Sequence, residues 1–232
     1  MIKLLSFLES ELDAIGFYNS LAVAIKKVPN SYNNKSLFLG ETVVFKEGIS
    51  ETKKPIVQKG DIRIDVPVLI GDVKSKHRVL ILGLEPRHTD DVFNIMKVGN
   101  KVFATPFGID RWYSDSKQGV YASAFERFLS SDKLFLFSDF VKEYWVADPG
   151  LKGKNDELAR ENFKQLFDKK YRLLLEKEIE LFEPTMIVAL GKVDISKKVP
   201  KSWLEKYNVQ VIAHPTNGNY KRMQTAMMNL MK

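Results

Sequence analysis

A chain of 232 residues is long enough for one substantial hydrophobic core, or at most two small ones. It contains no cysteine, which excludes disulfides, iron–sulfur clusters and thiolate-bound zinc and makes a reducing cytoplasm the expected location. The formal net charge of +7 favours a polyanionic partner, and no apolar run approaches the roughly 20 residues that span a bilayer.

The first third of the chain predicts helices followed by extended segments. The spacing of apolar residues indicates, in order, a helix over 2–12 that stops at Gly16, a second helix over 21–27, and extended segments over 36–46 and 62–70. Polar loops are expected between these segments, because they are rich in asparagine, lysine and glycine. We predict that residues 1–78 form a helical and extended cap packed on the core of one compact domain.

Four largely apolar runs in the rest of the chain predict strands that are buried on both faces. They cover residues 79–82, 134–137, 186–190 and 209–213. Helices are expected after these strands, at 90–97, 119–130, 155–182 and from 219 onward. This alternation predicts a parallel sheet with helices on both faces. We therefore expect an α/β fold, with a three-layer α/β/α core and a four-stranded parallel sheet over residues 79–232.

Polar residues follow three of the four predicted strands. Glu85, Asp139 and His214 each lie just beyond the end of an apolar run. The carboxyl ends of parallel strands meet at one edge of the sheet, where open α/β proteins bind their ligands. Gly83 ends the first run, because a residue without Cβ can take the sharp turn that follows. We expect these side chains to converge on one crevice.

Two further groups of residues have competing interpretations. The loop 105–108 reads Thr-Pro-Phe-Gly and is soon followed by Trp112 and Tyr113. Such a loop can stack a flat ligand, or its rings can pin it to the core. Lys197, Lys198 and Lys201 form a basic run, which is more typical of a solvated face than of a site.

Five short motifs, in order, resemble the uracil-DNA glycosylase superfamily. Residues 83–88 (GLEPRH) are similar to the first motif of the family, and residues 105–108 (TPFG) are similar to the loop whose phenylalanine stacks on the flipped base. Residues 137–142 (FSDFVK) resemble the strand end that reads the base. Residues 183–191 (EPTMIVALG) resemble a later strand of the family, and residues 214–216 (HPT) resemble its H-P-S motif. The resemblance extends from residue 79 to the end of the sequence. It implies a monofunctional DNA glycosylase that acts on DNA as a monomer, without cofactor or metal.

The resemblance also implies a set of site residues. Glu85 would lie near C1′ of the sugar and orient water, and His214 would donate a hydrogen bond to the base carbonyl. The residues expected around the base are Gly83, Arg87, His88, Phe107 and Asp139. Those expected on the DNA are Lys192, Thr216, Asn217, Tyr220, Lys221 and Arg222, with Tyr220 filling the gap that the flipped base leaves.

The departures from the family pattern leave the target base open. Glu85 stands in place of an aspartate or asparagine, Asp139 in place of the base-reading asparagine, and Arg87 in place of a tyrosine. An ionised Asp139 offers acceptors only and favours a cytosine-type base, whose amino group is a donor. A protonated Asp139 could mimic asparagine and read uracil. The expected substrate is therefore a uracil-like or modified cytosine base, with a preference for the cytosine-type base over uracil.

Two other functions compete with the glycosylase. One is a catalytically silent member of the superfamily that binds DNA or a protein through the same crevice. The other is a metal-dependent nuclease built on Asp61, Asp65, Asp72 and Lys74, which would need a divalent ion. Fold alone does not decide between them.

Overall fold

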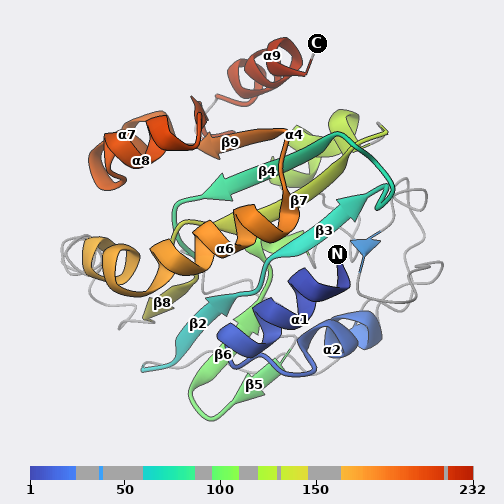
Figure 1. Cartoon of the computed structure of the whole chain (residues 1–232), viewed down its shortest axis with the longest axis vertical. Coiled ribbons are helices and arrows are strands. Elements are labelled where there is room, and N and C mark those ends of the chain that lie inside the picture. Colours follow the sequence, from blue (N-terminus) through green and yellow to red (C-terminus); the bar gives the residue numbers. More distant parts are fainter. Residues whose placement is uncertain are drawn as a thin grey trace.

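The computed structural model describes residues 1–24, 37–38, 60–86, 96–109, 120–129, 132–145, 163–216 and 219–231. A six-stranded sheet runs through the centre of this described part (Figure 1). Its order is β1 (Leu37–Phe38), β3 (Val68–Gly71), β7 (Leu134–Asp139), β4 (Arg78–Gly83), β9 (Met186–Leu190) and β10 (Gln210–Ile212). The last four strands are parallel to one another, whereas β3 is antiparallel to β7 and to β1.

The four predicted parallel strands are confirmed as neighbours in this sheet, and the α/β class with them. The predicted strand number of four is wrong, because the described residues add β3 and β1 at one side. Residues 68–71, which we expected in the cap, pair with β7 inside the sheet. Their three apolar side chains are fully buried there, but an apolar run does not reveal which sheet it will join.

A second sheet of four strands lies beside the first and has the order β5 (Met96–Val98), β6 (Lys101–Ala104), β2 (Ile62–Asp65) and β8 (Glu143–Trp145). Residues 96 and 97 belong to β5, so the helix predicted over 90–97 is wrong at that end. A two-residue turn, Gly99–Asn100, joins β5 to β6, with Gly99 at φ +59°. Glycine adopts this backbone conformation at little cost, and the turn therefore favours a hairpin.

The two sheets are joined at a corner through which two chain segments pass. β3 pairs with β7 as far as Val68 and Phe137, and β2 pairs with β8 from Ile64 and Glu143. Three residues, 65–67, therefore face five residues, 138–142, at the bend. The corner is closed by a hydrogen bond from the Asp65 amide to the Lys142 carbonyl, 2.8 Å long.

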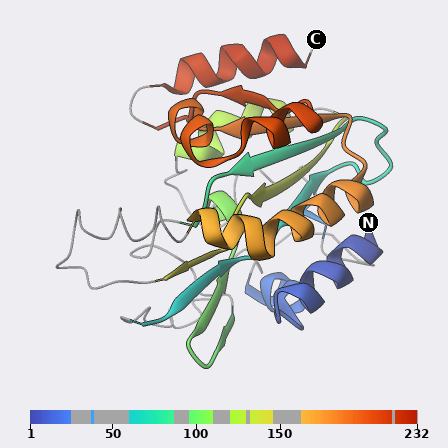
Figure 2. The same cartoon turned by 60° about the vertical axis from the view of Figure 1, so that its left-hand side comes forward.

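Helices cover both faces of the main sheet. α6 (Arg172–Phe182) crosses its front in Figure 1 and contacts α1 (Ile2–Glu11), while α4 (Val120–Leu129) lies behind it and contacts α9 (Tyr220–Leu230). The remaining helices are α2 (Phe17–Ala24), the short η1 (Pro106–Gly108), the π-helical turn η3 (Phe167–Tyr171), α7 (Lys192–Lys198) and α8 (Lys201–Lys206). Figure 2 shows α7, α8 and α9 at the end of the molecule away from α1.

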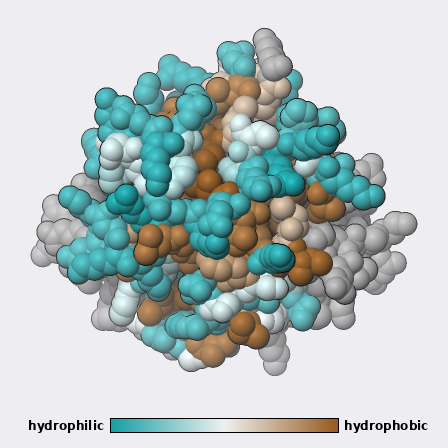
Figure 3. Space-filling model, viewed as in Figure 1, coloured by the Kyte–Doolittle hydropathy of each residue, from teal (hydrophilic) through white to brown (hydrophobic). Residues whose placement is uncertain are grey.

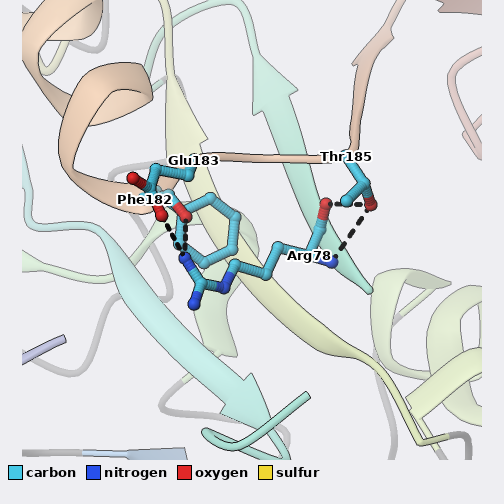
Figure 4. Close-up of polar contacts among 4 residues, drawn as sticks. All are labelled: Arg78, Phe182, Glu183 and Thr185. Atoms are coloured by element: carbon cyan, nitrogen blue, oxygen red, sulfur yellow. Dashed lines mark hydrogen bonds and ion pairs between the residues drawn. The ribbon is translucent and has the colours of Figure 1, made fainter. Parts of the chain in front are cut away.

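The amino end of β4 is tied to the end of α6 on the side of the sheet away from the strand carboxyl ends (Figure 4). Arg78 Nη1 donates to the Phe182 carbonyl and to Glu183 Oε2, both at 3.0 Å. The Thr185 hydroxyl donates to the Arg78 carbonyl and accepts from the Arg78 amide. The guanidinium thus satisfies a carbonyl that the helix end leaves unpaired.

One hydrophobic core runs through the described chain, from Leu4 of α1 to Met227 of α9. On the face seen in Figure 3, hydrophobic side chains form an interrupted band between hydrophilic ones. Leu173 of α6 is 72% exposed, an ordinary feature of protein surfaces when it occurs singly. No helix within the described ranges is both long and apolar enough to cross a bilayer.

Candidate functional site

The ends of β4 and β7 bring Gly83 and Asp139 together, because the two residues pair in the parallel ladder. A Cβ on Gly83 would collide with Asp139 Oδ1 and lie 3.1 Å from Phe107 Cζ. Any side chain at position 83 would displace the carboxyl group. The requirement for glycine at this position is therefore steric, and not the conformational one that the sequence suggested, because Gly83 is the last residue of β4 and its φ is not in the left-handed region.

Phe107 is half-buried and lies in η1, just after β6. Its backbone is left-handed, with φ +57° and ψ +12°, a conformation that costs a residue with a Cβ about 1 kcal/mol or more. Its ring packs at centroid distances of 5.1 Å from Tyr121, 5.9 Å from Phe137 and 6.3 Å from Phe125. These three rings hold Phe107 in place, so the loop is pinned to the core as well as presented at the strand ends. Trp112 and Tyr113 lie outside the described residues.

Asp139 is only 4% exposed, and its Oδ2 atom is buried without a hydrogen-bond partner in the described structure. Burial raises the pKa of Asp139 well above its usual range, and the nearby Asp65 carboxylate raises it further. Lys142 and Arg63 oppose this shift, and Glu178 adds to it. The direction favours a protonated acid, which has one O–H donor and acceptor capacity besides.

A buried ionic network lies beside Asp139. Lys142 is fully buried, with its Nζ 3.0 Å from Glu178 Oε1 and 2.8 Å from Ser138 Oγ, and it also donates to the Asp139 carbonyl. Ser138 Oγ donates to Glu178 Oε2 at 2.7 Å. The network fixes the backbone of the corner on which Asp139 stands. Glu178 was not predicted, because one carboxylate on a polar helix gives no sign that it faces inward.

Glu85 follows β4 and forms an ion pair that we did not predict. Its side chain is 4% exposed, and Oε1 lies 2.9 Å from Lys198 Nζ. Lys198 is 10% exposed, and its ammonium also lies 4.9 Å from the centre of the Phe163 ring. The assignment of Lys198 to a solvated face is therefore wrong. Lys198 is three residues after the buried Ile195 in α7, and that helical spacing was the available signal.

His214 follows β10 and has hydrogen-bond partners at both ring nitrogens. Nδ1 lies 2.7 Å from Thr216 Oγ1, and Nε2 lies 2.8 Å from the Tyr121 hydroxyl. The Tyr121 and His214 rings meet edge to face at 5.4 Å. Tyr121, in α4, was not predicted as a site residue, because nothing local distinguishes it from the other aromatic residues of that helix.

Phe107 lies between the Gly83–Asp139 pair and the Tyr121–His214 pair, since its ring lies close to Gly83 and also contacts the Tyr121 ring. We call Gly83, Phe107, Tyr121, Asp139 and His214 the strand-end cluster. It unites residues from β4, η1, α4 and β7 with the residue that follows β10. Asp139 and His214 are thus linked through the rings of Phe107 and Tyr121, whereas Glu85 contacts Lys198 of α7. The convergence of all three side chains on one crevice stays a prediction.

The residues expected on DNA occupy varied positions. Thr216 holds the His214 ring, and the Tyr220 hydroxyl donates to the Ser123 carbonyl at 3.0 Å, which gives Tyr220 an anchoring contact on α4. Lys192 is exposed at the start of α7, and Lys221 and Arg222 are exposed in the first turn of α9. Arg87, His88 and Asn217 lie outside the described residues.

The acidic residues considered for a metal site are engaged with donors. Asp61 pairs with Lys97 at 2.8 Å, Asp65 accepts from Arg63 at 2.7 and 3.0 Å, and Asp72 accepts from the Lys74 amide at 2.9 Å. Within the described ranges, no group of three or more His, Cys, Asp or Glu residues has a metal-binding arrangement. These contacts do not favour the nuclease.

The fold and the strand-end cluster define an α/β protein with a polar and aromatic site at the carboxyl ends of parallel strands. No model of a known protein family matches the chain, and no curated protein sequence is significantly similar to it. Any functional assignment therefore depends on the motif resemblance and on the geometry of the cluster.

Proposed function

We propose that this chain is a monofunctional DNA glycosylase of the uracil-DNA glycosylase superfamily. The contact of Gly83, Phe107 and Asp139 carries the proposal, because three separate motifs of the resemblance supply these residues. His214, from the last motif, is linked to them through Tyr121. Four parallel strands with helices on both faces also support the three-layer fold that the proposal requires. The net charge of +7 is favourable for binding DNA.

The reaction needs groups of opposite character on the two sides of the glycosidic bond. As the C1′–N bond breaks, its electron pair leaves with the base, positive charge develops on the sugar, and water attacks C1′. Glu85 would accept a hydrogen bond from this water and stabilise the cation, with Lys198 fixing the carboxylate. His214 and its hydroxyl partners would stabilise the anionic base, and Phe107 would stack on it.

The raised pKa of Asp139 changes the expected choice of base. An ionised carboxylate would reject uracil, because it would face the O4 acceptor without a donor. A protonated carboxyl can place its hydrogen on either oxygen and can therefore match the O4 and N3–H edge of uracil or the amino and N3 edge of cytosine. The direction of the shift thus supports a uracil-like base as well as a modified cytosine.

The direct test is a panel of oligonucleotides that carry different modified bases, each scored for alkali-labile abasic sites in the presence of EDTA. We expect abasic sites with at least one uracil-type or modified cytosine base, and full activity despite the chelator. Activity that vanishes with EDTA and returns with magnesium would favour the nuclease instead.

Two variants test the assigned roles. Glu85→Gln and His214→Ala should each lower turnover on the order of 10²-fold or more, because each removes an acid–base or electrostatic group. DNA affinity should change far less, since phosphate contacts supply most of it. Full activity of Glu85→Gln, with an unchanged melting temperature as a check of folding, would show that the carboxylate is misassigned.

The catalytically silent binding module has one observation in its favour. A chain without activity has a reason to keep Glu85, because the carboxylate pairs with the nearly buried Lys198. That module would bind DNA with an affinity that falls as salt rises, yet leave every base of the panel in place. The abasic-site assay therefore separates the two functions.

A further inference from the structure

The two ring nitrogens of His214 are both engaged, which restricts how this residue can reach a substrate. Nδ1 lies 2.7 Å from Thr216 Oγ1, and Nε2 lies 2.8 Å from the Tyr121 hydroxyl. A direct hydrogen bond from His214 to a base carbonyl would require one of these contacts to break. Thr216 is two residues away on the same turn, whereas Tyr121 comes from α4.

Tyr121 lies on the side of His214 that faces the rest of the strand-end cluster. Its ring contacts Phe107 at 5.1 Å with an interplanar angle of 61° and contacts His214 at 5.4 Å with an angle of 89°. The side chain is half-buried, so it is part of the packed site without being sealed in the core. A base stacked against Phe107 would therefore lie next to a ring that Tyr121 contacts.

The possible proton arrangements decide what that hydroxyl can do. A neutral imidazole with its hydrogen on Nε2 donates to the Tyr121 oxygen and accepts at Nδ1 from the Thr216 hydroxyl. An imidazolium donates to both oxygens. In both forms the Tyr121 O–H is turned away from His214, and the donated hydrogen bond makes the phenol a stronger donor. Only with the hydrogen on Nδ1 does the phenol O–H point at the histidine.

We propose that Tyr121 is the catalytic residue that donates a hydrogen bond to the carbonyl oxygen of the departing base, and that His214 is a positioning residue acting through it. The inference rests on the proposed glycosylase function and assigns the donor within it. The electron pair of the broken C1′–N bond becomes negative charge shared with the base carbonyl, and the phenol hydrogen bond stabilises that charge. No proton has to leave Tyr121, because water supplies both the hydroxyl that ends on C1′ and the proton that finally neutralises the base.

Tyr121→Phe tests this assignment by single-turnover kinetics on duplexes that carry the excised base. Loss of one preorganised donor to a developing anion lowers turnover on the order of 10²-fold, and we expect that loss with little change in DNA affinity. The Tyr121→Phe/His214→Ala double variant should be no slower than the slower single variant, because both act at one hydrogen bond. Thr185→Val is the matched control, since it removes a hydroxyl that bonds the Arg78 backbone at the amino end of β4, away from the cluster, and its turnover should be unchanged.

A 5-fluorinated form of the same base gives a readout that a structural role would not affect. Fluorine stabilises the departing anion, so the loss caused by Tyr121→Phe should be smaller on the fluorinated base than on the parent base. Turnover of Tyr121→Phe equal to or above that of the parent protein, or an equal loss on both bases, would overturn the assignment of the donor alone. A parent protein that excises no base from the whole panel would overturn the proposed function and this inference with it.

Discussion

Asp139 is the residue whose chemistry depends most on its surroundings. Its pKa is raised in the folded protein, above all by burial, so its contribution to stability is complete at acid pH. That contribution is lost as pH rises from the ordinary aspartate pKa of about 3.9 through the raised folded value. We expect Asp139→Asn, which cannot ionise, to gain stability relative to the parent protein over this interval. The gain should be at most about 1.4 kcal/mol per pH unit, measured by urea denaturation at several pH values.

The control for Asp139→Asn is Asp132→Asn, which changes a carboxylate whose side chain is 80% exposed. Its free energy of unfolding should follow that of the parent protein at every pH. If the Asp139→Asn curve also runs parallel to the parent curve, the carboxyl group is ionised in the folded protein. The argument for uracil would then fail, and a cytosine-type base would be favoured.

The pair formed by Glu85 and Lys198 gives a second prediction at this scale. Lys198→Met removes the ammonium that pairs with the nearly buried Glu85 carboxylate, which should cost about 3 kcal/mol. The double variant Glu85→Gln/Lys198→Met should recover part of that loss, because it removes the carboxylate together with the ammonium. Denaturant unfolding of the single and double variants measures the coupling. A double variant whose loss equals the sum of the single losses would contradict an ion pair of this strength.

Single residues could be predicted where a motif or a strand end marked them. Gly83, Asp139 and His214 could be predicted because each ends or follows an apolar run, and Phe107 because it lies in a loop that resembles a known motif. Tyr121 was missed, because its role depends on α4 packing beside the end of β10, a contact between segments far apart in sequence. Lys198 and Glu178 were missed for a related reason. Hydropathy assigns a charged residue to the surface, and only the tertiary structure shows that it has a buried partner.

At the scale of elements, the link from α6 to β9 contains a strained residue that can be tested. Glu183 ends α6 with φ +51° and ψ +59°, a left-handed conformation that glycine adopts more readily. Glu183→Gly and Glu183→Ala both remove the contact with Arg78, which involves a side chain that is 75% exposed. Because that loss is shared, the glycine variant should be more stable by about 1 kcal/mol, as measured by thermal or urea unfolding. Equal stability would show that the left-handed conformation costs little here.

The elements themselves were predictable where local pattern and tertiary role agree. The four parallel strands are buried on both faces, so continuous apolar runs reveal them directly. β3 was assigned to the cap, because its apolar run is separated from the others and its pairing with β7 is not local. The sequence pattern predicts a helix end at the start of β5, although Gly99 and Asn100 supply a hairpin signal. α7 and α8 were not predicted, because they are short and rich in lysine.

At the scale of the whole molecule, the strand-end cluster forms only when distant parts of the chain have folded together. Gly83 and Asp139 meet through the pairing of β4 with β7, and Tyr121 meets His214 through packing of α4 near the end of β10. At the buried corner between the two sheets, Lys142 contacts Ser138 and Glu178 and so fixes the backbone next to Asp139. Variants of the cluster must therefore be checked for folding before a loss of activity is assigned to chemistry.

The last prediction concerns the whole charge distribution and DNA. Lys192, Lys221 and Arg222 are exposed at the starts of α7 and α9, the helices that follow β9 and β10. Each phosphate that such a side chain neutralises releases a counterion and adds about 0.9 to the slope of log affinity against log salt. Replacing all three by alanine should weaken DNA binding and reduce that slope by about 0.9 for each phosphate that is no longer neutralised. Fluorescence anisotropy with a short duplex over a range of salt concentrations measures both quantities.

The matched control for this prediction replaces Lys3, Lys164 and Lys169, which are exposed outside α7 and α9, by alanine. It lowers the net charge by the same amount, so any effect of overall charge on diffusion and long-range attraction is equal in the two proteins. If DNA binds beside the strand-end cluster, only the first set of substitutions reduces the slope. Equal slopes in the two variants would mean that DNA is held by the general positive charge, and would remove Lys192, Lys221 and Arg222 from the interface.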